Sequence, residues 1–222
     1  MSTAHKNDLQ LPCLPARLEQ AERPEELIWM ARHSGEALKG WSIVGANLAG
    51  EDLRELELEG CVLQGCRLTG CDLRESRWQD VVLRQCDVSG VQAGESSFCR
   101  VHWQDVKALG ADLSNSGFHG LLMEDCRLER VNFSDSVFKF ARMCRCNLTG
   151  AWFQECRHSQ LEWENCTLVE TNFFKTPLKG VDFTSSQMER PVLSDTAQEL
   201  KGAIVSWEQA AQLAALLGLV IR

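Results

Sequence analysis

Eleven cysteines are the residues of this 222-residue chain most able to bind a metal or form covalent bonds. Three of them, Cys61, Cys66 and Cys71, stand five residues apart in the stretch CVLQGCRLTGCDLRES. Thiolates at short, regular spacing are typical of structural zinc sites and of disulfide frameworks. A metal site needs ligands that converge on one point, so the meaning of the spacing depends on the backbone that carries it.

The amino-acid composition indicates the cellular compartment and the class of partner that we expect. The chain begins without an apolar run long enough for a signal peptide, and no stretch approaches the ~18 apolar residues of a membrane span. We therefore expect a cytoplasmic protein without membrane contact, whose cysteines are mostly free thiols. The formal net charge is −8, which argues against direct binding to nucleic acid and favours a basic surface on a protein partner.

A period of five organises most of the chain. Every fifth residue from Ile43 to Leu193 is large and apolar, except Ala93, Ala108 and His158, over 31 positions. We call each of these positions a centre. The residue two before a centre is Cys, Ala, Ser, Val or Thr in 25 of the 31 repeats, and ten of the 16 glycines follow a centre by two residues.

This period fits neither a helix nor a straight strand. Residues two apart in an extended segment point to the same side, so the small and the large residue both face inward and the polar residue between them faces out. The remaining two residues turn a corner, where glycine tolerates unusual backbone angles. Each pentapeptide then forms one side of a coil, and stacked coils bury a continuous column of large side chains.

Segments such as GANLA at 45–49, ADLS at 111–114 and VNFS at 131–134 resemble the pentapeptide-repeat family. The resemblance covers residues 41–195 and implies an all-β solenoid, a right-handed quadrilateral β-helix of about 7.75 coils with four pentapeptides to a coil. At ~4.8 Å between strands the rod is roughly 37 Å long. The expected segments are a flexible tail at 1–22, a helical cap at 23–40, the β-helix at 41–195, and a capping and dimerisation helix within 196–222.

The cysteine spacing then has a structural explanation. Eight cysteines fall at the small inward position, where cysteine acts as a compact apolar filler. Cys61, Cys66 and Cys71 lie on successive sides of a coil and do not converge, while stacked parallel thiols lack disulfide geometry. The eight inward residues are Cys61, Cys66, Cys71, Cys86, Cys126, Cys146, Cys156 and Cys166.

No other group of residues has the spacing of a catalytic site. We expect His158 to be buried and hydrogen-bonded, because no nucleophile or metal ligand converges on it. The chain has neither a glycine-rich phosphate loop nor an HExxH motif, and side chains fill the narrow interior that a substrate would need. The sequence therefore predicts a protein that is not an enzyme and uses no cofactor or metal.

Both ends of the solenoid need caps. Residues 24–34 predict a helix whose Leu27, Ile28, Trp29 and Met30 cover the first coil. Ser206 and Gln209 form a capping box that begins a second helix. That helix is more apolar than a cap requires, so we expect it to pair with a second copy as well, with capping alone as the alternative. The expected dimer interface is Trp207, Ala210, Leu213, Ala214, Leu217, Leu219 and Ile221.

The C-terminal stretch LKGAIVSWEQAAQLAALLGLVI resembles the tail of the Qnr quinolone-resistance proteins and their mycobacterial relative. The resemblance implies a homodimer through the C-terminal helix and binding to DNA gyrase or topoisomerase IV, with protection against fluoroquinolones or a gyrase-poisoning toxin. Many Qnr proteins carry loops that interrupt the repeats, whereas the register here is unbroken from 43 to 193. A generic interaction scaffold, or an immunity-type protein with a different partner, therefore remains open. The matching residues are Leu200, Gly202, Gln209, Ala210, Leu213, Leu217, Gly218 and Val220.

Charge is unevenly distributed around the expected rod, because residues 20 apart share one side. The side centred on Leu53, Leu73 and every twentieth residue to Leu193 carries nine acids against three cations. The resemblance implies that this side imitates DNA. Duplex DNA carries about 22 charges over ~37 Å, so nine acids make a partial mimic, and a surface that serves only solubility is the alternative. The acids are Asp52, Glu55, Asp72, Glu75, Glu95, Asp112, Asp135, Glu155 and Asp195.

Overall fold

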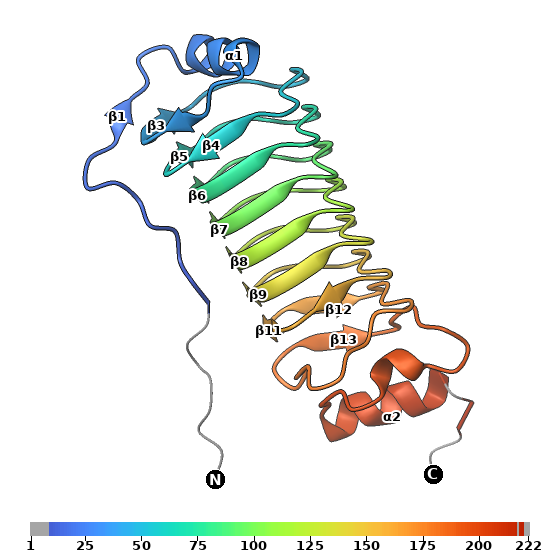
Figure 1. Cartoon of the computed structure of the whole chain (residues 1–222). Coiled ribbons are helices and arrows are strands. Elements are labelled where there is room, and N and C mark those ends of the chain that lie inside the picture. Colours follow the sequence, from blue (N-terminus) through green and yellow to red (C-terminus); the bar gives the residue numbers. More distant parts are fainter. Residues whose placement is uncertain (1–8, 217, 220–222) are drawn as a thin grey trace.

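A computed structural model describes residues 9–216 and 218–219 of the chain. They form a rod, a β-solenoid of about 9 turns with a helix near each end (Figure 1). Every strand pair is parallel, and partner residues along the middle of the rod are 20 apart, as in Leu63 with Leu83 and Leu83 with Trp103. The predicted fold class, a solenoid of pentapeptide repeats with four repeats to a coil, is confirmed.

The strands lie mainly on two neighbouring sides of the rod, and isolated bridges join the coils on the other two. In β6 to β9 each strand of eight residues spans two repeats. The strands are β1 (Glu19–Gln20), β2 (Leu38–Lys39), β3 (Trp41–Val44), β4 (Glu57–Glu59), β5 (Val62–Gln64), β6 (Arg77–Arg84), β7 (Ser97–Gln104), β8 (Gly117–Glu124), β9 (Val137–Cys144), β10 (Arg157–His158), β11 (Leu161–Glu164), β12 (Thr167–Val169) and β13 (Gln187–Glu189). The helices are α1 (Pro24–Ser34), the short 3-10 helix η1 (Gln198–Leu200) and α2 (Trp207–Leu216).

The core is a column of side chains from the centre positions. Phe98, Phe118 and Phe138 stack on successive coils with ring centroids 5.1 and 4.9 Å apart, within the range of favourable aromatic pairs. The small inward residues are buried beside this column. At Ser96, Ser116 and Ser136 the hydroxyl at this position donates to the preceding coil, as Ser96 Oγ does to the carbonyl of Leu73 at 3.2 Å.

The second residue after nearly every centre turns the corner in a left-handed backbone conformation, the exceptions being Gln160, Ser185 and Asp195. Gly110 does so with φ of 61°, but so do Glu75 and Asp135, with φ of 62° and 61°. The expected role of glycine at the corners is therefore confirmed, and many corners hold a non-glycine residue at a position that disfavours it.

Helix α1 covers the first coil with one face only. Ile28 and Ala31 are buried against the rod, whereas Trp29 and Met30 are 57% and 62% exposed. The expectation that these last two residues cover the coil is wrong, because a helix presents only one face to a flat end. Glu25 caps the first coil through a hydrogen bond. Its Oε1 accepts the N–H of Asn47 at 2.8 Å, in the place of the backbone carbonyl that a preceding coil provides farther along the rod.

The C-terminal end continues the coil past the recognised repeats. Ile204 pairs with Asp182 at a spacing of 22 rather than 20, because the segment with η1 adds two residues. The bridge between Asp182 and Ile204 extends the rod at this end, and β1 and β2 extend it at the other end. The rod is therefore longer than the expected 7.75 coils. Helix α2 then starts with the expected capping box, in which Ser206 N–H donates to Gln209 Oε1 at 2.8 Å and Gln209 N–H donates to Ser206 Oγ at 3.3 Å.

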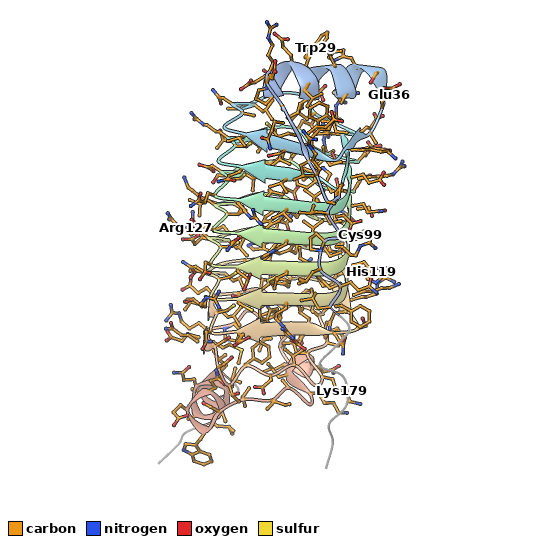
Figure 2. All side chains as sticks on the ribbon, turned by 90° about the vertical axis from the view of Figure 1, so that its left-hand side faces the viewer. Trp29, Glu36, Cys99, His119, Arg127 and Lys179 are labelled. Carbon is orange, nitrogen blue, oxygen red and sulfur yellow. The ribbon has the colours of Figure 1, made fainter. Side chains whose placement is uncertain are left out.

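Residues 9–20, the N-terminal strap, run along the outside of the rod toward α1 (Figures 1 and 2). The N–H of Cys13 donates to Oδ1 of buried Asp80 at 2.8 Å, and this carboxylate also holds the guanidinium of Arg100. Farther along, β1 pairs with β3. The expected flexible tail at 1–22 is therefore wrong for 9–22, since these residues pack on the rod, and 1–8 lie outside the described residues.

Two glycines of the rod make room for the strap. A Cβ atom at Gly60 would lie 2.9 Å from Cδ of Pro15, and one at Gly120 would lie 2.9 Å from the carbonyl oxygen of Gln10. Both distances are shorter than real Cβ contacts allow. The glycines thus allow close approach of the strap in addition to turning their own corners.

Candidate interaction surface

The acidic face is the side of the rod centred on Leu53 and each twentieth residue to Leu193. Backbone pairing lines up its outward residues, since Asp52 bridges to Asp72 and Gln92 bridges to Asp112. The corner residues form a second line along the same side, at ~4.8 Å from one coil to the next. This corner column is Glu55, Glu75, Glu95, Asn115, Asp135, Glu155 and Lys175.

The structure brings the acids predicted for this face to one side, but it pairs several of them with neighbouring cations. Arg54 and Arg74 bind Asp52 and Asp72 at 2.7 and 2.5 Å, and these hydrogen bonds hold the pKa of both carboxyls below the usual range. Glu155 similarly meets Lys175 Nζ at 3.0 Å.

Within the described residues, the other six of the nine acids of the face have no ion-pair partner. Asp112 is held by neutral groups, because it accepts the N–H of Ser114 at 3.1 Å and Nδ2 of Asn132 at 3.0 Å. The strongest uninterrupted run of unpaired charge is Glu55, Glu75 and Glu95, three corner residues in a row. The six acids are Glu55, Glu75, Glu95, Asp112, Asp135 and Asp195.

The C-terminal end of this face is more apolar. Trp152 is exposed at the outward position, which is usually polar, and Val192 is exposed two coils farther along. The sequence reasoning missed Val192, although an apolar residue at a position that is otherwise polar was a signal for it. A partner that follows the acidic face therefore meets apolar contacts at this end.

Helix α2 presents a smaller apolar surface than the sequence predicted. Leu213 is only 8% exposed and packs with the core, so its assignment to a dimer interface is wrong: it seals the last coil. Trp207 and Leu219 are 83% and 60% exposed, and Leu216, which the prediction omitted, is half exposed. Ala210 and Ala214 are half-buried. The predicted interface residues Leu217 and Ile221 lie outside the described residues.

The groups with potential chemistry do not form a reactive site. All eight inward cysteines are buried, and burial raises the pKa of the Cys61 and Cys71 thiols and that of Cys156 to about 12. The Nε2–H of His158 donates to the carbonyl of Pro177 at 2.6 Å; the predicted hydrogen bond is present, but the side chain is only half-buried. Within residues 9–216, 218 and 219, no three His, Cys, Asp or Glu side chains are placed to hold a metal ion.

Comparison with known proteins agrees with this architecture. The family model for pentapeptide repeats matches eight copies in this chain, over residues 42–77, 61–98, 111–150 and 146–188. The chain belongs to the pentapeptide-repeat family. In the described part of the chain, no helix is both long enough and apolar enough to span a membrane.

Solved structures similar to this pentapeptide-repeat protein include two of trypsin-treated QnrB1, a plasmid-mediated fluoroquinolone resistance protein. They are 21% and 20% identical, with TM-scores of 0.49 and 0.48; the matches cover 84% and 94% of this chain and 98% of each QnrB1 chain. HetL, involved in heterocyst differentiation regulation in the cyanobacterium Nostoc, is 13% identical with a TM-score of 0.33, and the match covers 80% of this chain and 95% of HetL. A comparison with curated proteins gave no match.

Proposed function

We propose that this protein binds a type II topoisomerase, DNA gyrase or topoisomerase IV, by offering its acidic face to the surface that otherwise holds DNA. The observation that carries the proposal is the run of unpaired Glu55, Glu75 and Glu95 on one edge of a continuously packed rod. Their ~4.8 Å spacing compares with one phosphate per 3.4 Å along each DNA strand. Because other acids of the face are paired, the imitation of DNA is partial.

The mode of action is competition for a binding surface, without bond making or breaking. A topoisomerase occupied by the rod holds less DNA, so fewer cleaved complexes are available to a fluoroquinolone or a gyrase-poisoning toxin. The protein then acts in the cytoplasm, where the enzyme and its DNA meet. The resemblance of the C-terminal tail to Qnr proteins supports this partner.

A homodimer through α2 would place two rods end to end and double the length of the acidic surface. Exposed Trp207, Leu216 and Leu219 supply apolar contacts for that pairing. The expected interface is smaller than the sequence suggested, since Leu213 is used within the chain.

A second function is a protein-interaction scaffold or immunity-type protein with a partner other than a topoisomerase. The local neutralisation of Asp52, Asp72 and Glu155 favours it, because a basic protein surface requires no regular ladder of charges. The unbroken repeat register from 43 to 193 favours it too, since no loop interrupts the recognised repeats.

Supercoiling by gyrase, with and without ciprofloxacin, tests the proposal. The triple variant Glu75→Lys, Glu95→Lys, Asp135→Lys reverses three of the four unpaired corner charges, with Glu55 left in place. A matched control, Asp105→Lys, Glu164→Lys, Asp182→Lys, makes the same change in net charge at exposed acids on another part of the rod.

We expect the wild-type protein to inhibit supercoiling or to protect it from the drug. The first triple variant should lose this effect at least about tenfold and the control should keep it, since several charge contacts of ~0.5 kcal/mol or more are removed together. A wild-type protein without effect at micromolar concentration argues for the scaffold function. Equal losses in both variants would show that only net charge matters.

A further inference from the structure

A second recognition feature lies at the N-terminal end of the rod. A groove of about 480 Å³ lies between α1 and the first coil of the rod. Helix α1 supplies Trp29 and Met30 to its wall, and the first coil supplies Glu51 and Asp52. Figure 2 shows Trp29 at this end of the molecule. Neither the repeats nor the acidic face requires such a groove.

The apolar wall is not needed to cap the solenoid. Ile28 and Ala31 already seal the first coil from the opposite side of the helix, while Trp29 and Met30 stay more than half exposed. Exposed tryptophan and methionine side by side are typical of binding surfaces rather than of solvent-facing helix positions.

The ring of Trp29 is held in place before any partner arrives. The imidazole of His33 lies against it with ring centroids 3.9 Å apart, and Nδ1–H of His33 donates to the carbonyl of Trp29 at 2.8 Å. A side chain fixed in this way loses little conformational freedom on binding, which favours affinity. One face of the indole is taken by His33, and the exposed remainder is available to a ligand.

The rim of the groove is acidic. Four carboxylates line it, from Glu25, Glu26, Glu51 and Asp52, against the single guanidinium of Arg32. Arg23 and Arg54 pair with two of the carboxylates from outside the groove, at 3.2 and 2.7 Å. The pair between Arg54 and Asp52 is bidentate, so Glu51, which has no ion-pair partner among the described residues, is the carboxylate most open to another cation. An anionic ligand is disfavoured at this site, and a cationic one is favoured.

We infer that this groove docks a short segment of a partner protein in which a lysine or arginine stands beside a large apolar residue. The apolar side chain packs on Trp29 and Met30, and the cation reaches Glu51 or the indole face. Asp52 belongs to the acidic face as well, so the groove continues that face at its N-terminal end. The inference does not depend on the partner being a topoisomerase.

Selection from a random phage-displayed dodecapeptide library on the immobilised full-length protein tests this assignment. Enriched peptides are then synthesised, and their affinities are measured by fluorescence polarisation against three proteins: wild type, Trp29→Ala, and Ile204→Ala as the control. Ile204 is a half-exposed apolar residue at the other end of the rod, where it pairs with Asp182. Thermal unfolding confirms that both variants fold.

The expected peptides carry Lys or Arg next to Leu, Phe or Trp. They should bind Trp29→Ala at least about tenfold more weakly than wild type, as is usual for a tryptophan anchor, and should bind Ile204→Ala unchanged. Glu51→Lys should weaken the same peptides through charge repulsion. The inference is overturned if enriched peptides are acidic, if none depends on Trp29, or if Ile204→Ala weakens them equally.

Discussion

Replacing an acidic corner residue with glycine should strengthen the fold while weakening the proposed function. Glu75 and Glu95 turn their corners with φ of 62° and 59°. The left-handed region costs an ordinary residue ~1–2 kcal/mol, whereas glycine adopts it freely and loses ~0.5–1 kcal/mol through its more flexible unfolded state. Each Glu→Gly change should therefore stabilise the protein by about 0.5–1 kcal/mol.

Repulsion between neighbouring carboxylates also predicts that Glu75→Gly stabilises the protein. Glu75 lies between Glu55 and Glu95 in the corner column, and none of the three has a cationic ion-pair partner within the described residues. Removing the middle carboxylate relieves repulsion on both sides, and this gain should shrink as salt is added. The combined effect predicts a higher unfolding midpoint for Glu75→Gly, by about 2–4 °C for each kcal/mol in a domain of this size.

Thermal unfolding followed by circular dichroism at low and high salt measures this effect. The matched control is Gly110→Glu, which puts glutamate into a corner with φ of 61° and open space around the added Cβ, so only the backbone penalty applies. It should destabilise by ~1 kcal/mol. Destabilisation by Glu75→Gly of more than ~1 kcal/mol would refute the reasoning, because it would mean that the glutamate side chain itself supports the rod.

Three further changes test other parts of the structure. Ellman's reagent should modify exposed Cys13 rapidly and the eight inward cysteines only on unfolding, and a chelator should leave the unfolding temperature unchanged; fast reaction of more than three thiols in the native protein would contradict this. Burial raises the pKa of Glu199, but hydrogen bonds from Lys175 N–H and from Ser194 outweigh burial and lower it. The ionised Glu199 carboxylate therefore stabilises the fold above its unfolded pKa near ~4.3, and this stabilisation is lost as the pH falls through the lower folded pKa. Glu199→Gln should flatten the acid side of the profile of stability against pH. An unchanged slope below about pH 4 would count against this role of Glu199. Leu213→Ala should lower stability by ~2–4 kcal/mol, whereas Trp207→Glu should leave stability within ~0.5 kcal/mol and shift a dimer to monomer in light scattering; the opposite ranking would reverse their assigned roles.

The five-residue period was enough to predict the fold, because in a solenoid the side chain that points inward is decided locally, five residues at a time. It also placed the acidic face, since residues 20 apart share a side. It did not predict how the acids pair. Asp72 and Glu75 look equivalent in the sequence, since each has an arginine two residues on. Arg74 folds back to Asp72, whereas Arg77 pairs with Glu57 of the preceding coil.

Parts of the chain outside the repeat were harder to predict. Residues 9–20 have no periodicity, and the residues that receive them, Gly60, Asp80 and Gly120, look like ordinary corners in the sequence. Consecutive apolar residues, as in Leu27 to Met30, do not say which of them face the rod. Leu213 shows the same difficulty, because an apolar residue on a terminal helix suits a cap and a dimer equally well.

The strap changes how the rod should come apart. A plain solenoid behaves as a one-dimensional stack in which each coil touches only its neighbours, so its end coils can fray independently. The strap contacts Gly120, Asp80, Gly60 and then β3 in turn, so one segment links coils that otherwise never meet. The N-terminal coils should therefore open together, as one cooperative unit, and hydrogen exchange should give their amides a common opening free energy rather than a gradient from the end.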